Sequence, residues 1–161
     1  MVSVRPAREE DLDAALGLDE AVAIEGRWIA REAPVDRIKR RAVFESDLRR
    51  DDATLFVADD DGAVVGLLGI ELSSYGVADF GMMVDPDRRG EGIGSMLLAA
   101  AVDWARSAGS HKLALQVWPH NEAAIALYRK FGFQQEGLLR GHYRRRNGEL
   151  WDALVMGLLL D

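Results

Sequence analysis

The stretch "RRGEGIGS", residues 88–95, places three glycines at alternate positions after two arginines. Apolar residues then recur from Ile93 to Trp104 with helical spacing, which predicts a helix of about four turns with one buried face. A strand candidate, "GVADFGMMV" at 76–84, precedes the glycines. A strand, a glycine-rich turn and a helix N-terminus together form a phosphate cradle. The first N–H groups of a helix are unpaired, and glycine lets the backbone approach a ligand closely.

Patterns on either side of this loop predict the remaining elements. Strands are predicted at 2–4, 54–58, 63–72, 76–84, 112–118, 137–146 and 149–159, and helices after residue 9, over 35–50, from 93 to just before 109, and over 121–131. Asp61-Gly62 and Asn147-Gly148 are tight-turn signals between paired strands. This order predicts one α/β domain over residues 1–161, with a mixed sheet and helices on both faces.

The helix predicted over 35–50 is heavily charged. Its thin apolar face is predicted to consist of Val35, Ile38, Ala42 and Leu48. The stretch before it, "EAVAIEGRWIAREAP", has no clean period and sets Trp28 and Ile29 among charges. Such a segment either lines the entrance of a substrate pocket or simply connects two helices, and the sequence leaves both interpretations open.

Composition excludes several classes of protein. The chain has no cysteine, so it has no disulfide, thiolate metal site or cysteine nucleophile. Its three histidines lack a metal-ligand spacing, which predicts no metal. A net charge of −7 argues against nucleic acid as a partner. No apolar run is long enough for a membrane span and no apolar signal region opens the chain, so we expect a cytoplasmic protein that does not bind membranes.

Three kinds of phosphate loop compete for residues 88–95. A P-loop needs a lysine after its last glycine, and this chain has none there. A dinucleotide fingerprint needs glycine at Ser95 and a place on the first strand–helix unit, whereas this loop follows four predicted strands. The third kind is Arg89-x-x-Gly92-x-Gly94, set between a strand ending in "MMVDP" and an amphipathic helix.

This third arrangement resembles the acyl-CoA-binding loop of the Gcn5-related N-acetyltransferases (GNAT). The resemblance continues downstream in "NEAAIALYRKFGF" at 121–133, and it runs from about residue 54 to the C-terminus. It implies a GNAT-like fold with a mostly antiparallel mixed sheet, acetyl-CoA as co-substrate and no metal. The closing "HYRRRNGELWDALVMG" is similar to the bacterial branch that acetylates free amino acids or related small amines.

The resemblance also implies residue roles in cofactor binding. It places the CoA pyrophosphate on backbone N–H groups of the loop, with the charge of Arg89 nearby, and the pantetheine arm along the strand that precedes the loop. Asn121 caps the next helix and would also contact pantetheine. The predicted cofactor-binding residues are Met82, Met83, Val84, Arg89, Gly90, Glu91, Gly92, Ile93, Gly94, Ser95 and Asn121.

For catalysis, the resemblance makes Tyr128 the general acid that protonates the departing thiolate. A core tyrosine is the alternative interpretation of that position. Asp79 matches a position where many relatives carry a glutamate base; its side chain is one methylene shorter, and Glu71 is the alternative base. Candidates for the substrate pocket are Glu25, Arg27, Trp28, His142 and Tyr143.

With no cysteine and no G-x-S-x-G elbow, the simplest chemistry is direct attack of an amine on the thioester in a ternary complex. The sequence therefore predicts an acetyl-CoA-dependent N-acetyltransferase that acts on a primary amine of a small molecule, an L-amino acid or analogue first. Acetylation of a protein N-terminus and a non-catalytic acyl-CoA-binding regulatory module are the alternatives. Dimers are common among proteins of this kind, so a homodimer remains open.

Overall fold

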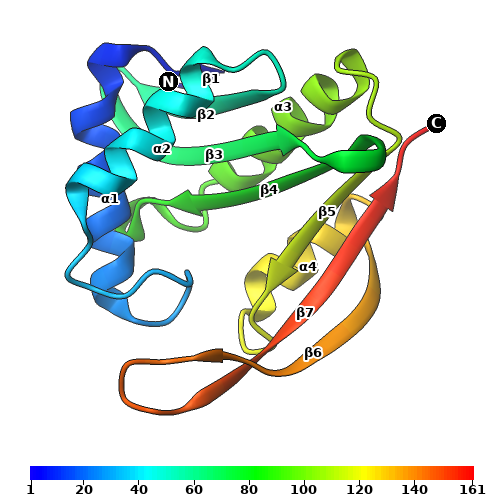
Figure 1. Cartoon of the computed structure of the whole chain (residues 1–161). Coiled ribbons are helices and arrows are strands. Elements are labelled where there is room, and N and C mark those ends of the chain that lie inside the picture. Colours follow the sequence, from blue (N-terminus) through cyan, green and yellow to red (C-terminus); the bar gives the residue numbers. More distant parts are fainter.

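Seven strands form one sheet in the computed structural model, which describes residues 1–161 (Figure 1). The strands are β1 (Val2–Pro6), β2 (Ala53–Asp60), β3 (Ala63–Leu72), β4 (Val77–Val84), β5 (Lys112–Val117), β6 (Gln134–Arg144) and β7 (Leu150–Leu159), and they lie in the order β1-β2-β3-β4-β5-β7-β6. The α-helices are α1 (Leu12–Glu25), α2 (Arg37–Arg49), α3 (Ile93–Ser107) and α4 (Glu122–Lys130). Each element confirms one predicted from the sequence, with ends shifted by a few residues.

The sheet is antiparallel except where β4 meets β5. These two strands run parallel, and they pair only from Val77–Lys112 to Asp79–Ala114. Beyond Asp79 they diverge, as Figure 1 shows, so the second half of β4 has no strand on that side. The backbone N–H and C=O groups on this edge are therefore free to pair with an extended ligand.

Helices cover both faces of the sheet and bury two separate apolar clusters. α1 and α2 lie on one face, where residues such as Leu16 and Phe44 pack on Leu55 and Leu67. α3 and α4 lie on the other face over a larger cluster that contains Phe80 and Leu97. This arrangement confirms the predicted α/β fold with a mixed, mostly antiparallel sheet. No helix combines the length and apolar character that spanning a bilayer requires.

The apolar face predicted for the charged helix is wrong in part: Leu48 packs on the α1–α2 cluster, but Ile38 and Ala42 do not. Ile38 is 85% exposed and Ala42 is exposed, whereas Phe44, which the prediction left out, is the buried residue of α2. One aromatic ring fills the space above the sheet, so the helix docks on the stripe that contains Phe44. Ile38 and Val43, on other sides of the helix, remain exposed to solvent. The rotation turns Arg40 and Asp47 inward, which decides the character of the site described below.

Candidate active site

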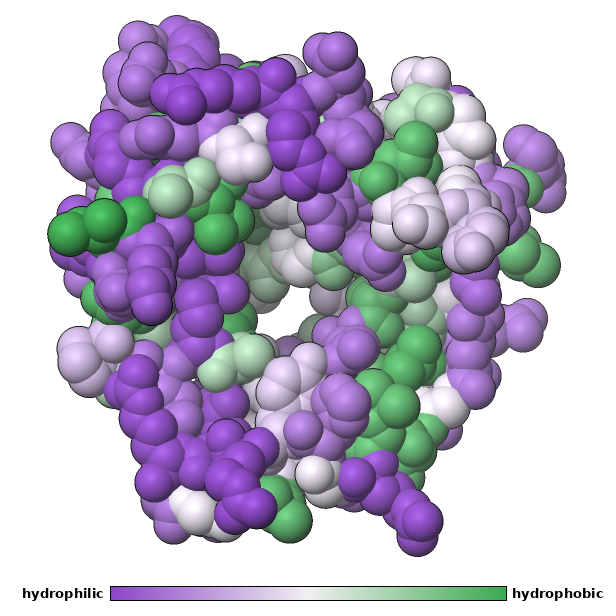
Figure 2. Space-filling model, viewed as in Figure 1, coloured by the Kyte–Doolittle hydropathy of each residue, from purple (hydrophilic) through white to green (hydrophobic).

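A cavity of about 430 Å³ lies where β4 and β5 diverge. Figure 2 shows it as a central hollow with a largely apolar wall, ringed by hydrophilic side chains. Its lining comes from strands β2 to β7, from α2 and α4, and from the loop between α1 and α2. The sheet normally separates its two helical layers, but here the gap between the strands connects them.

Three cross-strand pairs of β3 and β4 form the floor of the cavity on the α1–α2 side. They are Leu67 with Met83, Gly69 with Gly81, and Glu71 with Asp79. Side chains alternate along a strand, so all six positions share one face of the sheet. The glycine pair leaves the middle of this floor without side chains, and the carboxylates of Glu71 and Asp79 lie side by side at one end. Glu71 is held by Arg50 at 2.9 Å, whereas Asp79 makes no ion pair.

The side chain of Asp47, on α2, lies over Gly69 in this floor. Its Oδ2 lies 3.6 Å from the position that a Cβ on Gly69 would occupy. The carboxylate is half-buried and has no ion-pair partner. Burial raises the pKa of Asp47, and the negative charge of Glu71 raises it further.

We expect Asp47→Asn to stabilise the fold at neutral pH. The raised pKa means that the folded state binds the Asp47 proton more tightly than the unfolded chain, whose pKa is near 3.8. Stability is therefore lost as pH rises above that value, and the loss is complete once Asp47 is ionised in the folded state. Urea unfolding at pH 7.5 should show a higher midpoint for the variant, and the difference should shrink as the pH is lowered.

Asp51→Asn is the matched control for this experiment, because Asp51 lies exposed in the turn after α2 and makes no ion pair. A lower midpoint for Asp47→Asn at neutral pH would mean that the ionised carboxylate makes a stabilising contact in the fold.

Tyr128 reaches the cavity from α4 on the opposite side of the sheet. Its side chain is 6% exposed, and its ring packs at 5.9 Å from Phe80 and 5.6 Å from Phe133, between ring centroids. Burial alone raises the pKa of Tyr128, so the hydroxyl keeps its proton at neutral pH. Tyr128 is thus a core residue that also brings a protonated hydroxyl group to the wall of the cavity.

Asn121 and the end of β4 lie beside the gap. The Asn121 side chain accepts a hydrogen bond from the Ala124 N–H at 3.3 Å, which confirms the predicted helix cap, and the residue also lines the cavity. Met82 and Met83 line the cavity as well, whereas Val84 lies beyond its lining. All three residues belong to the part of β4 that β5 leaves unpaired.

The glycine loop ends at the N-terminus of α3. Gly90 and Gly92 have φ values of 81° and 83°, in the left-handed region that favours glycine. The first helical hydrogen bond runs from the Met96 N–H to the Gly92 carbonyl at 3.2 Å. The N–H groups of Ile93, Gly94 and Ser95 therefore precede the helical ladder and are available to an anion. A Cβ on Gly94 would lie 3.1 Å from Leu127, so glycine also permits close packing on α4.

Two arginines flank the loop, and both are held by carboxylates. Arg89 pairs with Glu25 at the end of α1, with Nη2 2.6 Å from Oε1. Arg88 donates hydrogen bonds to Asp60 and Glu91. These pairs join the loop to α1 and β2.

The predicted substrate residues divide into two groups. Trp28 and Tyr143 line the cavity, and the Tyr143 hydroxyl donates to Gln116 at 2.5 Å. Glu25, Arg27 and His142 lie outside its lining. Glu25 is bound to Arg89, Arg27 lies over the Trp28 ring at 4.7 Å, and His142 is exposed.

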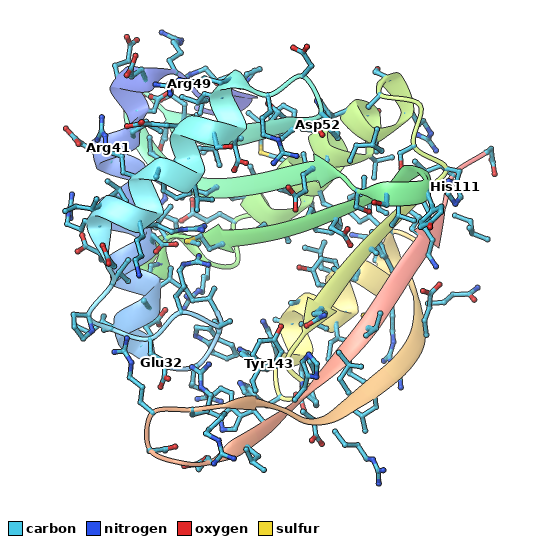
Figure 3. All side chains as sticks on the ribbon, viewed as in Figure 1. Glu32, Arg41, Arg49, Asp52, His111 and Tyr143 are labelled. Atoms are coloured by element: carbon cyan, nitrogen blue, oxygen red, sulfur yellow. The ribbon has the colours of Figure 1, made fainter.

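The loop between α1 and α2 touches the β6–β7 hairpin on one side of the cavity. Arg145 donates to the Ala30 carbonyl at 2.9 Å, and its guanidinium lies 4.3 Å from the Trp151 ring centroid. Glu32 accepts from the Arg146 N–H at 2.9 Å. Figure 3 shows Glu32 on this loop and Tyr143 on the hairpin side of the opening. These contacts join the two segments into one wall.

Sequence reasoning missed Arg40, Asp47 and Gln116, which all line the cavity. A signal for the first two was present: Arg40, Phe44 and Asp47 follow helical spacing, with the one aromatic residue of the segment in the middle. The apolar face predicted for that helix consisted of aliphatic residues alone and therefore left out the stripe of Phe44.

Comparison with known proteins agrees with this geometry. The model of the Acetyltransferase (GNAT) family matches residues 22–133, and the chain belongs to this family. It is 30% identical to the L-methionine sulfoximine/L-methionine sulfone acetyltransferase of Pseudomonas aeruginosa, over 99% of this chain and 95% of that protein. It is 29% identical to the spermidine N(1)-acetyltransferase of Escherichia coli, over 96% and 84% of the two chains.

The crystal structure of an N-acetyltransferase from Staphylococcus aureus Mu50 superposes on this chain with a TM-score of 0.91 at 26% identity, covering 100% of this chain and 99% of the other. Membership of the family makes this chain an N-acetyltransferase that uses acetyl-CoA, which confirms the class and the co-substrate predicted from the glycine loop.

Proposed function

We propose that residues 1–161 form a single domain that transfers the acetyl group of acetyl-CoA to the primary amine of a small molecule, with an L-amino acid or a close analogue as the first candidate. The observation that carries this proposal is the cavity between β4 and β5. It joins the carboxylate-lined floor on the α1–α2 side to Tyr128 on the α4 side. An amine and a thioester that enter from the two faces would meet there.

Backbone groups suit the co-substrate. The N–H groups at the start of α3, freed by the left-handed glycines, would bind the pyrophosphate, and the free edge of β4 at Met82 to Val84 would pair with the pantetheine arm. Asn121, at the same gap, would contact that arm. Acetyl-CoA supplies the activated acetyl thioester. A backbone N–H of β4 would then stabilise the negative charge that develops on the carbonyl oxygen.

Two side chains would move protons. Asp79 would take the proton that the ammonium must lose, directly or through water, before nitrogen attacks the carbonyl carbon. The C–N bond forms, the C–S bond breaks, and Tyr128 would donate its hydroxyl proton to the sulfur that leaves. The buried hydroxyl is neutral at working pH, as a proton donor must be.

Asp79→Asn should lower kcat/KM by about 100-fold, because an amide cannot accept the proton. Glu71→Gln should lower it by no more than a few-fold, since Glu71 is already bound to Arg50 on the same floor. Each variant replaces one carboxylate by its isosteric amide, and steady-state kinetics of both variants tests the two expectations. A larger loss for Glu71→Gln than for Asp79→Asn would reverse the assignment of the base.

The activity itself is tested by thiol release from acetyl-CoA, detected with a chromogenic disulfide. The chain contains no cysteine, so it adds no background. The panel holds amino acids including methionine sulfone, spermidine and short peptides. Release with free amino acids supports the proposal, and release with peptides alone would favour the N-terminal alternative. That alternative needs an open cleft, and the contacts of Arg145 and Glu32 across one side of the cavity argue against one.

A further inference from the structure

One stripe of α2 carries opposite charges into the cavity. Arg40, Phe44 and Asp47 all line it, at helical positions i, i+4 and i+7. The first and last are about 10.5 Å apart along the helix axis. Arg40 lies over the Phe44 ring at 4.6 Å. Arg40 and Asp47 do not form an ion pair with each other, and both residues line the cavity.

The charge of Arg40 is only partly compensated. Its nearest carboxylate, Asp19, is fully buried and is already bound by Arg31, whose Nε lies 2.9 Å from Oδ1. The Arg40 Nε is 3.4 Å from the same oxygen, and this buried atom has no hydrogen-bond partner. One carboxylate thus serves two guanidinium groups. Burial lowers the pKa of Arg40, and the charge of Arg31 lowers it further.

The carboxylates of the cavity lie at a different place. Asp47 hangs over Gly69, and Asp79 lies on the neighbouring strand at the end of the glycine floor. Neither makes an ion pair, whereas Glu71 is bound to Arg50. These residues do not form a group that could hold a metal ion. The cavity therefore offers one under-compensated cation and two free anions to a ligand.

We propose that Arg40 determines acceptor specificity by binding a carboxylate that the amine substrate carries, while Asp47 and Asp79 face its ammonium group. This inference rests on the proposed function and assigns its acceptor class. A guanidinium group binds a carboxylate through parallel N–H donors, which suits a partly buried arginine whose charge Asp19 compensates only in part. A polyamine such as spermidine has no anion to offer and would meet repulsion from Arg40. A zwitterionic amino acid matches both ends of the site.

The test compares acceptors that differ only in the carboxylate. Methionine sulfone, leucine and phenylalanine are each paired with the amine left by their decarboxylation. In the wild-type chain, kcat/KM should be at least about 10-fold higher for the amino acid of a pair. In Arg40→Met, the KM for the amino acid should rise by about 10- to 100-fold, and the KM for the decarboxylated amine and for acetyl-CoA should stay within a few-fold. Methionine keeps an unbranched side chain over Phe44.

Arg41→Met is the matched control. Arg41 is the next residue of α2, points outward in Figure 3 and binds Asp13 and Glu45 away from the cavity. Its replacement makes the same change in charge and should leave every KM unchanged. Thermal melting of all three proteins shows whether Arg40→Met folds.

Two outcomes would overturn the proposal: a wild-type preference for the decarboxylated amines or for spermidine, or an equal loss on both members of a pair in Arg40→Met. If Arg40→Met does not fold, the wild-type ratio of each pair still tests the acceptor class, and a ratio of one or less overturns the proposal. A wild-type chain that acetylates none of these amines would instead count against the proposed function itself.

Discussion

Tyr128→Phe should lower kcat by about 100- to 1,000-fold, with no change in the affinity for acetyl-CoA. The variant removes one oxygen atom and keeps the ring that packs on Phe80 and Phe133. A thiolate that leaves without a proton must be expelled as an anion into an apolar cavity, which is costly. Single-turnover kinetics measures the chemical step, and calorimetry with acetyl-CoA measures binding.

Tyr75→Phe is the control for Tyr128→Phe, because Tyr75 is 96% exposed and does not line the cavity. Unchanged turnover in Tyr128→Phe would exclude Tyr128 as the acid and leave it as a core residue only. Acetyl-CoA binding by a wild-type chain that never acetylates an amine would favour the alternative of a non-catalytic binding module.

Gly92→Val should raise the KM for acetyl-CoA by about 30- to 150-fold. A β-branched residue is a clear outlier at the φ of 83° that Gly92 adopts, so the loop must rearrange and its N–H groups must turn away from the phosphate. Losing one or two charge-assisted hydrogen bonds and adding strain costs about 2–3 kcal/mol, which corresponds to that change in affinity. The kcat at saturating acetyl-CoA should fall much less.

Gly109→Val separates strain from phosphate binding. Gly109 follows the other end of the same helix with a φ of 79°, and nothing lies within 4 Å of the position of its Cβ. The two variants should lose similar amounts of thermal stability, but the KM of Gly109→Val for acetyl-CoA should equal that of the wild-type chain. If both variants raise the KM equally, the effect of Gly92→Val comes from a damaged helix and not from the loop.

The local parts of the site could be predicted from the sequence because their signals lie within short stretches. The glycines at 90, 92 and 94 with the helix after them, and Asn121 seven residues before Tyr128, each belong to one continuous segment. The left-handed φ values of Gly90 and Gly92 and the cap by Asn121 follow from those stretches alone.

The remaining parts depend on contacts between distant segments. The glycine floor exists because Gly69 on β3 pairs with Gly81 on β4. The sequence of the two strands does not reveal their register, so it could not predict that these two glycines lie opposite each other. The inward face of α2 was set by how one ring, Phe44, packs on β2 and β3, which outweighed the aliphatic pattern. Likewise, Arg89 is bound to Glu25, 64 residues away, and no local pattern predicts that pair.

The gap between β4 and β5 also has a consequence for how such a protein evolves. Under the proposed function, the donor is held by the β4 edge, the α3 loop and α4, whereas the acceptor meets α2, the loop before it and the β6–β7 hairpin. Apart from β4, which also carries Asp79, these two sets of elements lie in different segments of the chain. A substitution on α2 can therefore change which amine is accepted without disturbing the machinery that activates the acetyl group. One scaffold can in this way acquire new acceptors one residue at a time while its chemistry stays constant.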